Sequence, residues 1–358
     1  MNYSSLFDFG RNLYSKYAFN PKTGEIKMPI RYILELTYRC NLKCPFCYIT
    51  GDRNINELSV EEWFKIIDQI PPFSLISLVA GEVLLKEGFD EIYKKVSEKF
   101  RKVTLISNGL KLDEKTIDLL IKHKLLLLSV SLDAVGEKHD KIRNHPGLYN
   151  KIMANLNLFN EKRKGKKSPM LDIKTCVLEN NLDDLPLLYK EAEKLNAQFF
   201  SLTFIRKQTL RQNSILWNEF SHEFNQDTYP IELYFDIEHF KEIYKELESL
   251  QKNFKTTLRY APRFNATGDI EKIEKFFNSG NKPVTELYKP CHIPMTSIYI
   301  TPIGDIYPCL SLKVANLREM SLKEAINTTK FKCFRKNLHC AKVFNACQMC
   351  CDAIPKNL

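Results

Sequence analysis

The sequence lacks the long apolar runs that membrane helices and secretion signals require. No stretch approaches the roughly 20 apolar residues of a membrane span, and the first 19 residues have no uninterrupted apolar core. Internal repeats, low-complexity tracts and recognised nucleic-acid-binding motifs are also missing. We therefore expect a cytoplasmic protein with no membrane partner and no nucleic-acid partner.

The composition is that of an ordinary globular protein. The 358 residues are 44% hydrophobic and 27% charged, enough for one large α/β domain and a smaller one. The net charge of +10 comes from lysines spread along the chain, with one dense run at residues 162–167 that is typical of a solvated loop. An anionic substrate or an acidic electron donor could also use this excess charge.

Eleven cysteines stand out in a chain expected to meet a reducing compartment. Disulfides are rare there, which leaves metal binding, catalysis or core packing for the thiols. Most of them lie within residues 40–47 and 291–351. This clustering favours metal binding.

Alternating strand and helix patterns indicate the fold. Helix-period segments such as Ser59–Gln69, where Ser59 and Glu62 form a capping box, separate short β-type runs. This alternation predicts parallel strands with right-handed crossovers, in a partial (β/α)6 TIM-like barrel rather than a complete barrel. The six predicted strands are 32–36, 75–79, 103–106, 126–131, 171–177 and 199–204.

The same patterns divide the chain into four parts. We expect an N-terminal extension over residues 1–30 and the barrel core over 31–205. A mostly helical connector follows over 206–290, with one helix around Ile237–Leu250. Residues 291–358 then form a small cysteine-rich domain that opens with a hairpin-like segment over 297–307.

Three closely spaced thiols directly follow the first predicted strand. Cys40, Cys44 and Cys47 have the spacing C-x3-C-x2-C, at the strand end where α/β barrels carry out chemistry. Three thiolates leave a metal centre one ligand short of four, so one position stays open for a reaction. The alternatives are a zinc site completed by a distant residue and buried thiols that are merely close.

With Phe46 and Tyr48 beside the last of these cysteines, the motif resembles the signature of the radical S-adenosylmethionine (SAM) superfamily. The resemblance implies a [4Fe–4S] cluster held by Cys40, Cys44 and Cys47, whose fourth iron binds SAM. It implies reductive cleavage of SAM to a 5′-deoxyadenosyl radical that abstracts hydrogen from a substrate. A flavodoxin- or ferredoxin-type protein would donate the electron.

Four further segments carry the resemblance. Gly81 and Glu82 match part of a Gly-Gly-Glu-Pro element that holds the amino group of SAM, although Ala80 and Val83 depart from it. Asn108 lies in a Ser-Asn-Gly turn of the family. The Ser131-Leu132-Asp133-Ala134 stretch and the His139–Arg143 stretch imply that Ser131 and Arg143 contact the ribose and carboxylate of SAM.

The C-terminal cysteines resemble a SPASM/twitch extension of the same superfamily. The element C-x12-G-x4-C and a late C-x2-C imply an auxiliary [4Fe–4S] cluster, and a twitch-like domain with one cluster fits better than a full SPASM domain. A zinc ribbon is the alternative. The exact set stays open because Cys333, Cys340 and Cys351 could replace an assigned ligand. The implied ligands are Cys291, Cys309, Cys347 and Cys350.

The reaction itself is marked by few residues. Cys176, in an apolar strand, is either a buried thiol or the hydrogen-atom donor of an epimerase. Leu310 stands where sulfatase-maturing relatives have an aspartate, and only about 30 residues precede the first strand, too few for a winged-helix peptide-recognition domain. We therefore expect a small, anionic metabolite as substrate, with a ribosomal peptide as the alternative and a structural zinc-binding adaptor as the non-enzyme alternative.

Overall fold

A computed structural model describes residues 3–47, 49, 55–204, 236–262, 284–309, 312–344, 347, 350 and 352–356. Within these ranges the strands form one ten-stranded sheet, in the order β10-β9-β8-β1-β2-β3-β4-β5-β6-β7. The strands are β1 (Arg31–Glu35), β2 (Leu75–Val79), β3 (Lys102–Ser107), β4 (Leu127–Ser131), β5 (Met170–Val177), β6 (Phe199–Phe204), β7 (Thr257–Ala261), β8 (Ser297–Ile300), β9 (Asp305–Tyr307) and β10 (Ala315–Asn316).

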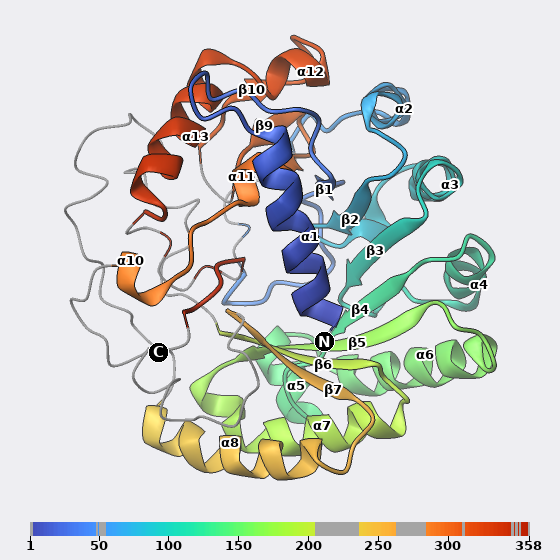
Figure 1. Ribbon diagram of the computed structural model, residues 1–358. Coiled ribbons are helices and arrows are strands. Elements are labelled where there is room, and N and C mark those ends of the chain that lie inside the picture. The colour runs from blue at the N-terminus through green and yellow to red at the C-terminus, as the bar shows by residue number, and fades with distance from the viewer. Residues whose placement is uncertain are drawn as a thin grey trace.

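The strands from β1 to β6 are parallel neighbours in chain order, as the alternating pattern predicts. Figure 1 shows them curving past one another with a layer of helices on their outer side. The partial barrel expected from the sequence is therefore confirmed. The helices of this layer are α2 (Val60–Gln69), α3 (Phe89–Lys99), α4 (Glu114–Lys122), α6 (Leu148–Arg163), α7 (Leu185–Lys194) and α8 (Ile237–Gln251).

Local sequence signals explain where these elements start and what they bury. Ser59 and Glu62 form the predicted capping box at the start of α2, and this helix buries Trp63 completely against the sheet. Along β5, Leu171 and Ile173 are buried, whereas Lys174 and Cys176 alternate with buried neighbours and are partly exposed. The outer face of the sheet is thus apolar and packs on the helices, and the inner face is more polar.

The prediction of a mostly helical connector over residues 206–290 needs one correction. Its predicted helix is present as α8, but Thr257–Ala261 forms β7, which pairs in parallel with β6. The barrel therefore gains a seventh parallel strand. The five-residue strand alternates apolar and polar residues, and the surrounding polar sequence hid this short signal.

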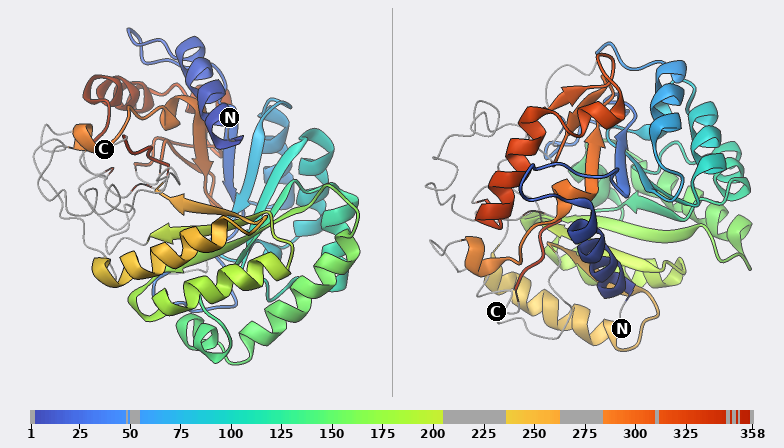
Figure 2. Two further views of the ribbon diagram at one scale, coloured as in Figure 1. Left: turned by 60° about the horizontal axis from the view of Figure 1, so that its bottom comes forward. Right: turned by 45° about the horizontal axis from the view of Figure 1, so that its top comes forward.

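The C-terminal segment joins the same sheet on the other side of β1. Strand β8 pairs in parallel with β1 and forms the predicted hairpin with β9, which pairs antiparallel with β10. Figure 2 shows α1 (Tyr3–Ala18) beside this segment, and Ser15 Oγ lies 3.2 Å from His292 Nδ1. The other short helices are η1 (Val83–Leu85), α5 (Glu137–Arg143), η2 (Glu179–Asp184), α10 (Val284–Leu287), α11 (Ile293–Thr296), α12 (Leu322–Ala325) and α13 (Thr329–Ala341).

None of the helices in the described ranges is both long enough and apolar enough to cross a membrane.

Candidate active site

The three N-terminal thiols lie in the loop that follows β1. The amide of Cys47 donates to the carbonyl of Cys44 at 3.1 Å, and the amide of Leu42 lies 3.4 Å from Cys40 Sγ, so the loop turns tightly. Burial raises the pKa of the Cys44 thiol, the Arg143 guanidinium opposes this rise, and the thiols of Cys47 and Cys40 add to it. The three thiols therefore lie near one another in this loop, although among the described residues they are not gathered tightly enough to hold a single metal ion.

Two of the predicted cofactor residues reach this loop, one from the turn after β3 and one from α5. Asn108, after β3, donates from Nδ2 to Asn41 Oδ1 at 2.8 Å and lies 3.8 Å from Cys40 Sγ. Arg143, at the end of α5, places a guanidinium nitrogen 3.9 Å from Cys44 Sγ and lies over the Phe46 ring at 5.5 Å. Tyr48, the second predicted aromatic residue, lies outside the described residues.

A buried carboxylate orients Arg143. Asp133 is fully buried, and its Oδ2 accepts from Arg143 Nε at 2.7 Å while its Oδ1 accepts from the amide of Cys176 at 2.9 Å. Its own amide donates to His139 Nδ1 at 3.0 Å, and burial lowers the pKa of His139 to about 4, so this ring is neutral near pH 7. Sequence reasoning gave Asp133 and His139 no role, although both stand in the stretches that carried the resemblance.

The Glu82 side chain accepts hydrogen bonds from the turn after β3. Its carboxylate is fully buried and accepts from Ser107 Oγ at 3.0 Å and from the amide of Asn108 at 2.7 Å. Burial raises the pKa of Glu82 to about 7, against these hydrogen bonds and the charge of Arg143. The expected contact with the amino group of SAM would have to compete with these bonds, so Glu82 holds Asn108 in place in this structure.

The backbone beside Glu82 explains the glycine of this motif. Gly81 has a φ of +37°, and a Cβ at this position would lie 2.4 Å from the carbonyl oxygen of Arg39. The amide of Glu82 donates to the same carbonyl at 2.9 Å. A glycine is therefore needed for the close approach of this turn to the residue that precedes Cys40. Ala80 departs from the family pattern at a φ of +77°, where glycine is favoured.

Ser131 and Cys176 mark the ends of β4 and β5 on the inner face of the sheet. Ser131 is paired in register with Lys174, two residues before Cys176. Burial and the nearby Asp133 raise the pKa of the Cys176 thiol to about 12, and the thiol of Cys44 is also within electrostatic reach. Cys176 is therefore a neutral thiol close to the cluster loop.

The C-terminal thiols form a second group. Burial raises the pKa of the Cys291 thiol, and the thiols of Cys347, Cys350 and Cys309 act on it electrostatically. These four thiols therefore interact electrostatically, although among the described residues they are not gathered tightly enough to hold a single metal ion. By contrast, Cys333 and Cys340 are exposed on α13, and Cys351 and Leu310 lie outside the described residues.

An ion pair fixes the second group at the amino end of β1. Arg31, the first residue of β1, bonds Asp352 Oδ1 at 3.1 Å, two residues after Cys350. Tyr299 of β8 donates from its hydroxyl to Asp352 Oδ2 at 3.0 Å. The two thiol groups therefore lie at opposite ends of β1.

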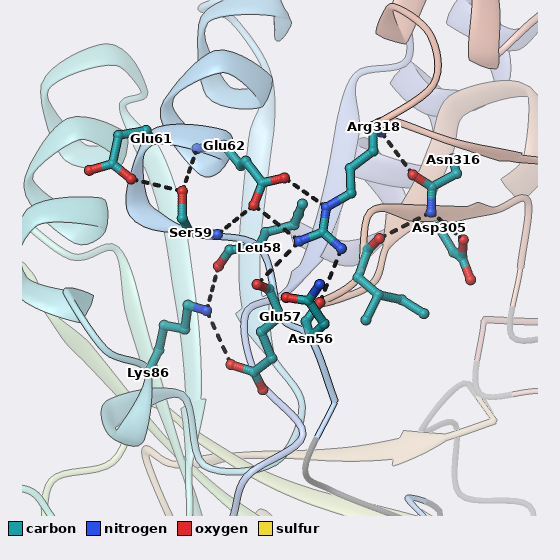
Figure 3. Close-up of polar contacts among 11 residues, drawn as sticks. Asn56, Glu57, Leu58, Ser59, Glu61, Glu62, Lys86, Asp305, Asn316 and Arg318 are labelled. Carbon is teal, nitrogen blue, oxygen red and sulfur yellow. Dashed lines mark hydrogen bonds and ion pairs between the residues drawn. The ribbon is translucent and has the colours of Figure 1, made fainter.

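A polar clamp joins Lys86 and residues 56–62, which follow the cluster loop in the chain, to Arg318 of the C-terminal segment, as Figure 3 shows. Glu57 accepts from the amide of Tyr38 at 3.1 Å and pairs with Lys86 Nζ at 3.1 Å, and both side chains of this ion pair are nearly buried. From the C-terminal segment, Arg318 bonds the Glu62 carboxylate at 2.7 Å and the carbonyls of Asn56 and Glu57 at 3.1 and 3.3 Å. No sequence motif marked this clamp.

Two family models match the chain where the thiol groups lie. The model described as the radical SAM superfamily matches residues 34–192, and the model described as an iron–sulfur cluster-binding domain matches residues 291–351. The first match runs from the last two residues of β1 through β5 and includes Cys40, Cys44 and Cys47. The second runs from Cys291 past Cys350.

Several curated proteins are similar to this chain. The antilisterial bacteriocin subtilosin biosynthesis protein AlbA of Bacillus subtilis (strain 168) is 26% identical over 188 residues, which is 51% of this chain and 41% of AlbA. The AdoMet-dependent heme synthase of Methanosarcina barkeri (strain Fusaro / DSM 804) is 24% identical over 324 residues, which is 88% of this chain and 86% of that protein. The chain thus aligns with less than half of AlbA.

Solved structures share the fold. SuiB of Streptococcus suis bound to S-adenosylmethionine has a TM-score of 0.64 and 16% identity, covering 88% of this chain and 69% of that one. The protein anSMEcpe with bound AdoMet and a peptide has a TM-score of 0.59 and 17% identity, covering 91% of this chain and 89% of that one. Their sequence identity is low, so these matches bear on the fold alone.

The family matches set aside the zinc-binding adaptor and the zinc ribbon. Together with the partial barrel and the two thiol groups, they show that this chain is an enzyme of the radical SAM superfamily, with a C-terminal SPASM-type domain and with [4Fe–4S] clusters and SAM as its cofactors.

Proposed function

We propose that this enzyme abstracts a hydrogen atom from a ribosomally made peptide. The observation that carries this proposal is the match to peptide-processing proteins by sequence and by fold. AlbA is a bacteriocin biosynthesis protein, the sporulation killing factor maturation protein SkfB is 28% identical over 48% of this chain, and SuiB has been solved with its precursor peptide SuiA. The small metabolite favoured by the sequence becomes the second candidate.

The N-terminal thiols would hold the cluster that binds SAM. Cys40, Cys44 and Cys47 fit it because they lie in one tight loop and interact electrostatically. When bound, the cluster supplies the electron that cleaves SAM to a 5′-deoxyadenosyl radical. The protein supplies donors that fix the loop, since Asn108 and Arg143 each place a nitrogen within 4 Å of a thiol.

The remaining predicted contacts with SAM divide into direct and indirect ones. Ser131 and Arg143 lie at the carboxyl edge of the sheet, where they would contact the ribose and carboxylate of SAM. Glu82 would act mainly through the Ser107–Asn108 turn, because its carboxylate already accepts two hydrogen bonds from that turn. Gly81 has no side chain and would therefore let its own turn lie close to the Arg39 carbonyl. Phe46 would cover Arg143 from the loop side.

Cys291, Cys309, Cys347 and Cys350 would hold the auxiliary cluster. Four thiolates can satisfy a four-iron cluster completely, so its role would be electron transfer or structure. A flavodoxin- or ferredoxin-type protein would donate the electron to the enzyme. The net charge of +10 on this chain favours a donor with an acidic surface. Free thiols and clusters of this kind belong in a reducing compartment such as the cytoplasm.

Cys176 is proposed as a hydrogen-atom donor to the substrate. Its thiol stays protonated near pH 7, because burial and Asp133 raise its pKa to about 12. It also lies within electrostatic reach of Cys44, on the inner face of the sheet. Cys176→Ala would then leave cofactor cleavage intact and divert the product, a change that mass spectrometry after reaction in deuterated water would detect.

The test of the main proposal uses anaerobic, cluster-loaded enzyme with SAM and a reductant. Short peptides encoded beside the gene are added singly, and 5′-deoxyadenosine and peptide mass are measured. We expect one peptide to stimulate 5′-deoxyadenosine formation and to change in mass. If no peptide does so while a small carboxylic metabolite is converted, peptide maturation is wrong.

The second candidate is a small, carboxylate-bearing molecule. The observation that favours it is the alignment with the AdoMet-dependent heme synthase, which extends over 88% of this chain. The same assay separates the two candidates when a haem precursor replaces the peptides. Stimulation by the haem precursor alone would select this candidate.

A further inference from the structure

Side chains join the carboxyl ends of β4 and β5 where strand pairing stops. The amide of Leu132, just after β4, still donates to the Lys174 carbonyl at 3.0 Å. Two residues further along β5, the amide of Cys176 donates at 2.9 Å to the Asp133 carboxylate instead of a strand carbonyl. The Asp133 side chain therefore takes the place of a strand partner at the point where the sheet meets the candidate site.

Asn181 fixes the same junction from η2. Its side chain is fully buried, and its Nδ2 donates to the carbonyl of Asp133 at 2.7 Å and to that of Cys176 at 2.8 Å. Its Oδ1 accepts from the amide of Leu178 at 2.9 Å. The amide and the carbonyl of Cys176 are thus both bonded to buried side chains. A shift of this residue would break at least one of these hydrogen bonds.

Asp133 also holds α5 at two places. In the first turn of the helix, the buried His139 accepts through Nδ1 from the Asp133 amide at 3.0 Å. At its last residue, Arg143 donates from Nε to Asp133 Oδ2 at 2.7 Å. Both carboxylate oxygens are therefore committed inside the protein, one to the Cys176 amide and one to Arg143. A rotation of the carboxylate that improves one bond would weaken the other.

The bond to Asp133 decides which donors of Arg143 remain for a ligand. The Nε nitrogen faces Asp133, and Nη1 lies 3.9 Å from Cys44 Sγ. In the described part of the chain, no hydrogen bond or ion pair uses Nη2. A planar guanidinium presents N–H donors on more than one edge, so a second carboxylate can bind the Nη edge while Asp133 keeps Nε. This edge lies beside the thiol loop, where the carboxylate of SAM is expected.

We propose that Asp133 is a positioning residue that couples the SAM site to Cys176. Through Oδ2 it orients the Nη edge of Arg143 toward the cofactor, and through Oδ1 it holds the backbone of Cys176. A ligand that fixes Arg143 therefore also restrains Asp133 and, through it, the end of β5. The inference rests on the proposed function for the role of Cys176 as a hydrogen-atom donor. It adds that bound SAM holds this thiol in place.

Amide hydrogen exchange tests this coupling without a substrate. Anaerobic, cluster-loaded enzyme is labelled with and without SAM, and a peptide covering residues 172–178 is followed by mass spectrometry. SAM should slow exchange at the end of β5 about tenfold, because the bond between Asp133 and the Cys176 amide opens less often when Arg143 is fixed.

Asp133→Asn should remove this slowing. An Asn side chain can still accept from the Cys176 amide, but its NH₂ group then faces Arg143 Nε, and two donors cannot bond each other. The dissociation constant of SAM should rise about tenfold, since Arg143 loses a charge-assisted hydrogen bond that orients it. The kcat of uncoupled cleavage should stay within about twofold at saturating SAM, so the effect falls on KM.

Asp172→Asn is the matched control. Asp172 is another buried carboxylate of β5, and its described partners are the hydroxyls of Ser129 and Ser201. This variant should keep both the SAM affinity and the SAM-dependent slowing. Arg143→Lys is the second variant if Asp133→Asn does not fold. It keeps the charge and should lose the slowing, because an ammonium lacks the separate Nε and Nη edges.

The outcomes separate the coupling from the proposed function. Exchange at the end of β5 that does not respond to SAM in wild-type enzyme would overturn the coupling. An Asp133→Asn enzyme that keeps the slowing and the affinity would overturn it as well, and an equal loss of affinity in Asp172→Asn would reduce Asp133 to a structural role. If SAM slows exchange as expected but no peptide stimulates 5′-deoxyadenosine formation, the peptide function fails and the coupling stands.

Discussion

The two thiol groups of this protein are held in different ways. The N-terminal group lies in a tight loop and receives nitrogen donors from residues after β3 and at the end of α5. The C-terminal group includes Cys291, whose partly exposed thiol interacts electrostatically with the other three thiols. Three thiolates would leave one iron of a four-iron cluster open to a ligand, whereas four thiolates would close it. With the proposed ligand sets, this difference would separate a reaction centre from an electron-transfer or structural centre.

The sharpest test of this contrast removes the open centre. Replacing Cys40, Cys44 and Cys47 by alanine should reduce 5′-deoxyadenosine formation to background, because no iron with a free position would bind SAM. Bound iron should fall from about eight to about four per chain. Iron analysis and chromatography of the products check both numbers. Cleavage at the wild-type rate would contradict the assignment.

Removing the closed centre should have a different effect. Cys309→Ala with Cys347→Ala should also lose about four irons, but SAM binding and uncoupled cleavage should survive while substrate conversion falls. The matched control is Cys333→Ala with Cys340→Ala, since these thiols are exposed on α13. If the control pair loses iron as well, the ligand set needs revision. Electron paramagnetic resonance distinguishes the clusters.

The buried ion pair of the clamp should affect stability rather than chemistry. Lys86→Met leaves the Glu57 carboxylate nearly buried without its main cation, which should lower the free energy of unfolding by about 3 kcal/mol. Denaturant unfolding at equal iron loading measures this change. The Arg39 guanidinium also lies 3.5 Å from the Glu57 carboxylate. A loss below 1 kcal/mol, which is about a factor of five in the folding equilibrium, would show that Arg39 substitutes for Lys86.

Arg318 should matter less, because its side chain and that of Glu62 are each about one-third exposed. We expect Arg318→Gln to lower stability by about 1 kcal/mol, mainly through its lost bonds to the Asn56 and Glu57 carbonyls. If the clamp also positions the cluster loop, KM for SAM should rise while iron content stays constant. An unchanged KM would restrict Arg318 to a structural role.

The smallest expected effect is a gain. Ala80 occupies a left-handed backbone conformation with a φ of +77°, so Ala80→Gly should stabilise the protein by about 0.5–1 kcal/mol. Ala192→Gly, in the buried face of α7, is the control and should destabilise it. Thermal unfolding of both variants provides the comparison. A destabilised Ala80→Gly protein would show that the alanine methyl packs favourably.

Elements with local signals were predictable from the sequence. The six strands, the Ser59 cap and the hairpin after Cys291 each follow from periodicity, side-chain capping or turn chemistry. Strand β7 and the addition of β8 to the edge of β1 were not predicted. The alternation of the first was hidden by the polar sequence around it, and the second depends on pairing between segments far apart in the chain.

The candidate site also contains residues that a local motif revealed and residues that it did not. The spacing of Cys40, Cys44 and Cys47 was visible as a local motif, and so was the stretch that contains Arg143. The buried partners Asp133 and Glu57 gained their roles only from tertiary contacts, which no spacing encodes. Glu82 shows a further limit, since the motif implied a ligand contact and the structure gives its oxygens to Ser107 and Asn108.

The position of β1 between the two thiol groups sets a length scale for electron movement. Arg31 begins this strand and ties it to Asp352 beside Cys350, and Cys40 follows five residues after its end. A five-residue strand is about 17 Å long, so two clusters at its ends would be too far apart to bind one substrate atom together. Electrons would have to tunnel between the two clusters. The strand would keep the distance between the clusters constant while the substrate changes.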